Sequence, residues 1–182
     1  VEVAKKSYTP MNWPPQLGMG LSAIGDFNPG NGNFPNGCQV AEVEIDPDTG
    51  KIELVKHNIV NDVGYVINPL LLRGQIHGGV AQGVGQALLE QMVYDPDNGQ
   101  LLTASFQDYC MPRADDFPNF TTENLSFPTK TNPLGVKGAG ETGTVGAPPA
   151  VVGAITDALG IDDIDMPVTP EKIWRTLNER AK

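Results

Sequence analysis

The sequence predicts an α+β fold in which antiparallel β-hairpins carry helices on one face. Residues 40–45 alternate apolar and polar side chains, and a turn sequence and a second strand-forming stretch follow them, as in a hairpin. Residues 69–92 and 145–159 have the length, apolar content and flanking cap residues of helices. With 182 residues, the chain is long enough for one domain with a substantial core.

The N-terminal part differs in composition from the rest. Residues 1–39 are rich in Gly, Pro and Asn, which predicts an irregular arm. Residues 40–182 contain no internal linker or repeat, so we expect them to form one domain.

The first hairpin consists of strands at 40–45 and 52–60 around an Asp/Pro/Gly-rich turn at 46–50. Asn68 then caps a helix over residues 69–92, with proline at its first position. Each glycine inside a helix costs roughly 1 kcal/mol relative to alanine. A helix with five glycines is therefore expected to pack closely, against either a sheet or a bound group. The glycines of this helix are Gly74, Gly78, Gly79, Gly83 and Gly85.

A second hairpin is predicted from residues 91–94 and 100–103, which flank a turn sequence at 95–99. Residues 124–127 form a short strand. These elements complete the predicted sheet.

Two further helices are predicted after the sheet. The first covers residues 145–159, has prolines in its first turn and ends at Gly160. The second starts after Thr169 and runs to about residue 180. Its expected buried face consists of Ile173, Trp174 and Leu177.

A single carboxylate lies in a glycine-rich loop. Residues 134–147 read LGVKGAGETGTVGA, with five glycines around Glu141. Because the glycines carry no side chains, a ligand can approach the backbone closely. Glu141 is then the only strong proton acceptor at the centre of the loop. This arrangement suits a general base beside a bulky cofactor. The alternative role for Glu141 is an acid that stabilises the helix dipole.

Two other functions compete with a catalytic loop. Gly138 to Gly143 match the dinucleotide fingerprint G-x-G-x-x-G, and Asp162 and Asp163 follow about 20 residues later. However, residues 129–135 are a poor strand, and Glu141 would repel a pyrophosphate. The remaining alternative is a non-catalytic assembly domain whose glycine-rich segments pack against a partner.

Composition excludes several classes of protein. Twelve basic and 22 acidic residues give a net charge of −10, which argues against nucleic-acid binding. No apolar run is long enough for a membrane span, and no signal-peptide core is visible. Cys38 and Cys110 cannot supply a zinc site or an iron–sulfur cluster. A disulfide between them is one alternative, but in a reducing compartment we expect two buried free thiols. We expect a cytoplasmic protein, with the periplasm left open.

Three stretches resemble the molybdenum-binding subunits of the xanthine oxidase family of molybdopterin hydroxylases, which includes xanthine dehydrogenases, aldehyde oxidoreductases and aerobic carbon monoxide dehydrogenases. Residues 134–141 (LGVKGAGE) resemble the active-site glutamate loop, and residues 73–85 (RGQIHGGVAQGVG) the glycine-rich helix. Residues 106–112 (FQDYCMP) more loosely resemble the stretch between them. Because such subunits are several times longer, the resemblance implies the C-terminal portion of a larger molybdopterin-binding domain.

The resemblance implies a molybdopterin-dependent oxidoreductase that oxidises an aldehyde, a purine, an N-heterocycle or CO with oxygen from water. Glu141 would be the general base. No protein ligand to the metal is expected, because the cofactor's dithiolene holds it. The cofactor would be molybdenum–molybdopterin or its cytosine dinucleotide form. The residues expected to contact it are Gln82, Gly79, Lys137, Gly138, Ala139 and Gly140.

The resemblance also implies partners. Iron–sulfur clusters and FAD would lie on other chains or domains, so the chain would act only with the rest of the molybdenum subunit and an iron–sulfur subunit. The presence of a separate FAD subunit is not specified by the resemblance. Two expected contacts have alternatives: Gln82 can instead bond a neighbouring backbone group, and Lys137 can steady the loop rather than bind the cofactor's phosphate.

Overall fold

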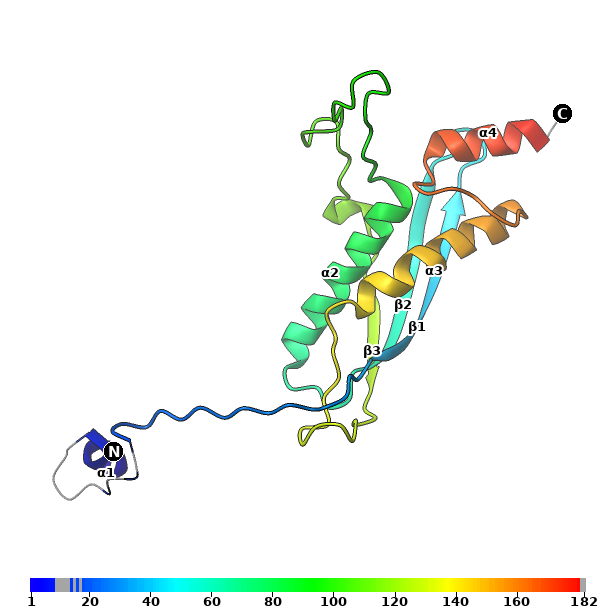
Figure 1. Ribbon diagram of the computed structural model, residues 1–182. Coiled ribbons are helices and arrows are strands. Elements are labelled where there is room, and N and C mark those ends of the chain that lie inside the picture. Colours follow the sequence, from blue (N-terminus) through cyan, green and yellow to red (C-terminus); the bar gives the residue numbers. More distant parts are fainter. Residues whose placement is uncertain (9–13, 15, 17, 181–182) are drawn as a thin grey trace. The chain divides into compact units, whose positions relative to one another are not determined.

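The computed structural model describes residues 1–8, 14, 16 and 18–180 (Figure 1). The chain divides into two compact units, Val1–Gly30 and Asn31–Lys182. The first unit contains helix α1 (Glu2–Tyr8), where the sequence predicted no regular element. An acidic residue in its first turn and two lysines in its last turn complement the helix dipole.

The second unit contains a three-stranded sheet in the order β1-β2-β3. Strands β1 (Asn36–Ile45) and β2 (Ile52–Asp62) form the predicted antiparallel hairpin, with a β-bulge between Glu42 and Val43. Strand β1 begins four residues before the predicted start. The α+β class is therefore confirmed, and β2 occupies the centre of the sheet.

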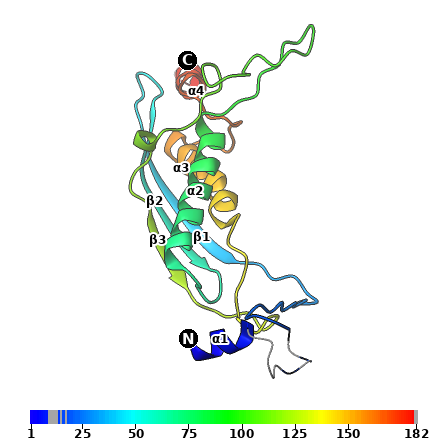
Figure 2. The ribbon, with the colours of Figure 1, turned by 90° about the vertical axis from the view of Figure 1, so that its left-hand side faces the viewer.

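Strand β3 (Thr121–Leu125) pairs with β2 in parallel, so the sheet is mixed rather than wholly antiparallel. A parallel pair needs a long crossover connection, and the segment containing α2 (Pro69–Leu88) supplies it. The predicted second hairpin forms its turn but does not extend into strands of the sheet. It is reduced to an isolated bridge between Tyr94 and Leu101, in a segment that extends away from the sheet (Figures 1 and 2).

The predicted helix caps are confirmed. The Asn68 side chain accepts hydrogen bonds from the backbone nitrogens of Leu70 at 3.0 Å and Leu71 at 3.2 Å, at the start of α2. The Thr169 hydroxyl accepts one from Lys172 N at 3.4 Å, at the start of α4 (Pro170–Arg180).

Two expectations for α2 and α4 are corrected. Helix α2 ends at Leu88, four residues earlier than predicted. In α4, Ile173 is fully buried and Leu177 partly buried, whereas Trp174 is 45% exposed. A short 3-10 helix, η1 (Ala114–Asp116), precedes β3.

Helix α3 (Thr142–Leu159) starts three residues before the predicted position. Pro148 and Pro149 therefore lie inside the helix and not in its first turn. The predicted C-cap is confirmed, since Gly160 has the left-handed conformation (φ 60°, ψ 45°). The earlier start makes Glu141 the residue that immediately precedes the helix.

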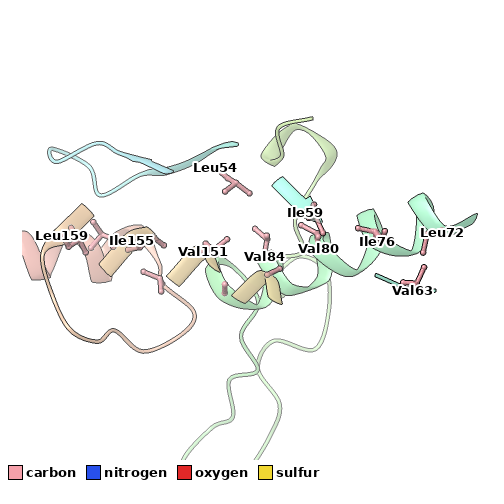
Figure 3. Close-up of a cluster of buried hydrophobic side chains, with 14 residues drawn as sticks. Leu54, Ile59, Val63, Leu72, Ile76, Val80, Val84, Val151, Ile155 and Leu159 are labelled. Carbon is pink, nitrogen blue, oxygen red and sulfur yellow. The ribbon is translucent and has the colours of Figure 1, made fainter. Parts of the chain in front are cut away.

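Helices α2 and α3 lie side by side over one face of the sheet (Figures 1 and 2). Side chains of β2 point toward those of the two helices and form the core (Figure 3). The core includes Leu54, Ile59, Val63, Leu72, Ile76, Val80, Val84, Val151, Ile155 and Leu159. This packing fixes the first turn of α3 against α2 and the sheet.

Cys38 and Cys110 are free thiols, as expected, but both are exposed rather than buried. No helix within the described ranges has the length and apolar character needed to cross a membrane.

Candidate functional site

Glu141 is the N-cap residue of α3 and is exposed. Its side chain makes no capping hydrogen bond, and no ion pair to it is found within the described part of the chain. It lines a cavity of about 340 Å³ together with Phe34, Gln39, Asn61 and Val145, among others. The carboxylate is therefore available to a ligand instead of serving the helix as a cap.

The loop before Glu141 is tied to the sheet by a buried ion pair between Lys137 Nζ and Asp62 Oδ2. Asp62 Oδ1 also accepts hydrogen bonds from the backbone nitrogens of Gly64 and Phe127, both at 3.0 Å. Burial raises the pKa of Asp62, but the bonds from Lys137, Gly64 and Phe127 outweigh it and hold the pKa at about 2. Asp62 is therefore ionised, and the Lys137 ammonium is engaged by it.

Backbone contacts reinforce this attachment. Gly64 and Val136 form an antiparallel bridge, and Lys137 N donates to Val63 O at 2.9 Å. A Cβ on Gly64, which has φ +68°, would overlap the carbonyl oxygen of Gly135. The segment leading to Glu141 thus follows the end of β2 closely.

The first turn of α3 packs directly on α2. A Cβ on Gly143 would overlap the carbonyl oxygen of Ile76, and one on Gly79 would lie 2.9 Å from Thr144 N. The Thr144 hydroxyl donates to Gly79 O at 3.0 Å and contacts Gln82 Oε1 at 3.4 Å. Helix packing therefore accounts for glycine at position 79, and Thr144 links Gln82 to the turn after Glu141.

Gln82 is exposed and lines a second cavity of about 510 Å³, together with Gly78 and Tyr109. Neither of these two cavities is lined by both Gln82 and Glu141. The two predicted site residues are connected through Thr144, which contacts Gln82 and lies in the first turn of α3.

Another group of glycines has no packing reason in this chain. At Gly78, Gly138 and Gly140, an added Cβ would meet nothing within 4 Å, and the backbone is not in the left-handed region. All three are exposed, whereas Ala139 packs partly against the core. Glycine at these positions suits a bulky group that approaches the backbone from outside the chain. The exposed backbone around Glu141 therefore leaves room for a large cofactor.

The sequence did not point to Gln39, which lies just before the expected start of the first strand. Its amide nitrogen donates to the carbonyl oxygens of Thr142 at 3.1 Å and Gly143 at 2.9 Å. Its amide oxygen lies 2.8 Å from Nε2 of His57, which is fully buried and whose pKa is lowered by burial. A neutral His57 that donates from Nε2 satisfies this contact. Gln39 thus joins the sheet to the turn that follows Glu141.

The dinucleotide fingerprint lacks its structural context. The residues before Gly138 form a loop with an isolated bridge, and β3 has already ended at Leu125. Gly143, the last glycine of the pattern, packs against α2. Within the described residues, no three His, Cys, Asp or Glu side chains are grouped so that they could hold a metal ion.

Comparison with known proteins gives concordant matches. Residues 1–118 match a family model described as a molybdopterin cofactor-binding domain. The 6-hydroxypseudooxynicotine dehydrogenase complex subunit gamma of Paenarthrobacter nicotinovorans is 42% identical over 160 residues, which cover 85% of this chain and 20% of that protein.

Solved structures agree. A Cu,Mo-CO dehydrogenase superposes with a TM-score of 0.87 at 33% identity, over 99% of this chain and 23% of that one. Quinoline 2-oxidoreductase from Pseudomonas putida 86 superposes with a TM-score of 0.71 at 41% identity, over 75% of this chain and 18% of that one. The chain thus spans about a fifth of the length of the relatives that it matches.

Proposed function

Because the chain belongs to the molybdopterin cofactor-binding domain family and to the molybdenum-binding subunits of the xanthine oxidase family, we propose that it supplies the general base of a molybdenum hydroxylase. One observation carries the proposal. Glu141 is an exposed carboxylate, free of hydrogen-bond and ion-pair partners in the described residues, that lines a cavity beside open glycine backbone. A carboxylate kept free in this way can accept a proton from a reacting group.

Some residues of the chain contact the cofactor directly, and others hold those residues in place. Gln82 offers an amide donor and acceptor, and the bare backbone at Gly138, Ala139 and Gly140 lets the group come close. Gly79 and Lys137, also expected to contact the cofactor, are assigned indirect roles. Gly79 lets α3 pack onto α2, and Lys137 steadies the loop through Asp62.

When bound, the molybdenum cofactor supplies the redox centre that takes two electrons from the substrate. Glu141 accepts the proton of a water-derived oxygen as that oxygen bonds to the substrate carbon. The fixed backbone around Glu141 keeps the carboxylate in place for this step. Such positioning contributes to rate because geometry is established before the reaction begins.

The substrate is an aldehyde, a purine, an N-heterocycle or CO. The relatives carry names that refer to a nicotine derivative, CO and quinoline, so membership of the family leaves this choice open. We propose that the rest of the molybdenum subunit and an iron–sulfur subunit are partners, with FAD on a further chain or domain. We propose that the pterin is the plain or the cytosine dinucleotide form. The proposed location of the complex is the cytoplasm, with the periplasm as the alternative.

The test is to purify the native complex that contains this chain and to measure molybdenum and released pterin per complex. Electron transfer to an artificial dye is then followed with benzaldehyde, hypoxanthine, quinoline, nicotine and CO. Bound molybdenum with turnover of at least one of these supports the proposal. An assembled complex that holds no molybdenum and turns over none of them contradicts it, and would favour a non-catalytic assembly role.

A further inference from the structure

We propose that Gln39 is a positioning residue for Glu141: from β1 it holds two carbonyl groups of the first turn of α3 and so fixes the direction of the carboxylate. This inference rests on the proposed function, because it assigns Gln39 a part in the same proton transfer. Gln39 itself does not accept the proton.

The Gln39 amide has partners on both sides. Its nitrogen donates to Thr142 O at 3.1 Å and Gly143 O at 2.9 Å, the carbonyls of the two residues that follow Glu141. Because the nitrogen must face these acceptors, the oxygen faces His57, 2.8 Å from Nε2. The orientation of the amide is therefore determined by three contacts.

His57 is a fixed anchor for this amide. Its ring is fully buried in the helix-facing side of β2, and the Phe120 ring meets it edge-on at a centroid distance of 6.0 Å. A residue so placed cannot follow movements of the first turn of α3. Gln39 therefore transmits the position of the sheet to that turn.

The helix makes room for the side chain of Gln39. A Cβ on Gly146, one turn into α3, would lie 2.7 Å from Gln39 Nε2 and 2.8 Å from Cδ. From the opposite side, Gly143 and Thr144 attach the same turn to α2. The turn is thus held from β1 and from α2 at once.

Glu141 depends on this turn for its direction. Its side chain makes no capping hydrogen bond of its own, and Val145 N donates to its carbonyl at 3.1 Å. If the turn shifts, the carboxylate shifts with it. A displacement of about 1 Å at a reacting group can lower a rate by on the order of 100-fold.

The experiment uses the complete enzyme and the dye-linked assay with whichever substrate of the panel supports turnover. Gln39→Met keeps the length of the side chain and removes its hydrogen bonds. We expect kcat to fall by on the order of 10- to 100-fold, with KM and molybdenum content unchanged. Gln91→Met, at an exposed position after α2, is the matched control and should retain the wild-type kcat.

A double-mutant cycle separates positioning from general stability. In a Glu141→Gln background, adding Gln39→Met should change the slow single-turnover rate by less than about twofold, because the group that Gln39 positions is already gone. A structural role would instead lower the rate by the same factor in both backgrounds. Equal factors would therefore overturn the proposal.

A readout that does not depend on activity is hydrogen–deuterium exchange of residues 141–147 in complexes prepared without the cofactor. Gln39→Met should increase exchange there, and Gln91→Met should not.

Gly146→Ala disturbs the same contact from the helix side, because its Cβ would lie against the Gln39 amide. It should reproduce both the loss of kcat and the increase in exchange, so the test remains possible even if Gln39→Met does not assemble. Wild-type kcat and exchange in either assembled variant contradict the inference, whereas full activity of Glu141→Gln contradicts the proposed function itself.

Discussion

Asp62, at the end of the central strand, and Lys137, four residues before Glu141, form a buried ion pair across 75 positions of sequence. Their side chains are only 10% and 11% exposed. The pair joins the glycine-rich loop to the most buried strand of the sheet. The position of the loop that leads to Glu141 therefore depends on the position of β2.

The ion pair predicts a response to acid. The pKa of Asp62 is lowered from 3.8 to about 2 in the folded state, so its contribution to stability is present above about pH 4 and is lost as pH falls toward 2. In Asp62→Asn this contribution is missing. The unfolding temperature of the variant complex should therefore fall less steeply than the wild type's between pH 4 and 2. Equal slopes in the two proteins would contradict the assignment.

Glu141→Gln keeps the shape of the side chain but cannot accept a proton. Turnover in the complete enzyme should fall by about 10²–10⁴-fold, while molybdenum content and unfolding temperature stay near wild type. Glu44→Gln, at an exposed position on β1, is the control. A Glu141→Gln enzyme that keeps more than about a tenth of the wild-type rate would rule out the general base.

Gly143→Ala should destabilise the protein although alanine favours helices. Its Cβ would overlap the Ile76 carbonyl, and such overpacking costs about 1–3 kcal/mol in free energy of unfolding. Gly153→Ala is the matched control on the same helix. No atom lies within 4 Å of its Cβ, so the free energy of unfolding should rise by roughly 0.5–1 kcal/mol. Denaturant titration measures both changes, and the same sign in both variants would refute the packing argument.

Gly140→Ala tests the open backbone near Glu141. Because its Cβ would meet nothing within 4 Å in this chain, the unfolding temperature should hardly change. If the cofactor lies against this backbone, molybdenum per complex should fall. Gly153→Ala, which adds the same methyl group away from the loop, should retain the metal. Full metal content in Gly140→Ala would show that the cofactor does not approach there.

Gln82→Ala should weaken cofactor retention more than folding. The side chain is exposed and its polar contact, with Thr144, is long at 3.4 Å, so little stability depends on it. One or two hydrogen bonds to the cofactor, of about 0.5–1.5 kcal/mol each, would be lost. Molybdenum content measured alongside a melting curve decides between cofactor contact and packing.

Local features were well predicted from the sequence. Asn68, Thr169 and Gly160 cap or end helices where expected, because capping depends on a few neighbouring residues. The first hairpin follows from alternation and turn chemistry in the same way. The family was also recognisable, because the glycine-rich segments around Gln82 and Glu141 are contiguous in sequence.

Pairing between distant segments was not predictable in this way. The parallel alignment of β3 with β2 arises because the crossover that contains α2 returns the chain to the same sheet, and the sequence pattern of a strand does not specify its neighbour. The second hairpin remains limited to one bridge for a related reason. Its turn chemistry is sound, but no neighbouring strand extends its single bridge.

The sequence by itself determined the caps at Asn68, Thr169 and Gly160, the first hairpin and the glycine-rich loop that carries one carboxylate. Only the tertiary structure decided what each glycine does: Gly143 lets two helices touch, whereas Gly140 faces open space. It also brought Asp62 to Lys137 and Gln39 to the turn after Glu141. The physical reason is the sequence separation of the interacting residues. Capping and strand alternation involve residues close in sequence, whereas ion pairing and close packing depend on which distant segments the fold brings together.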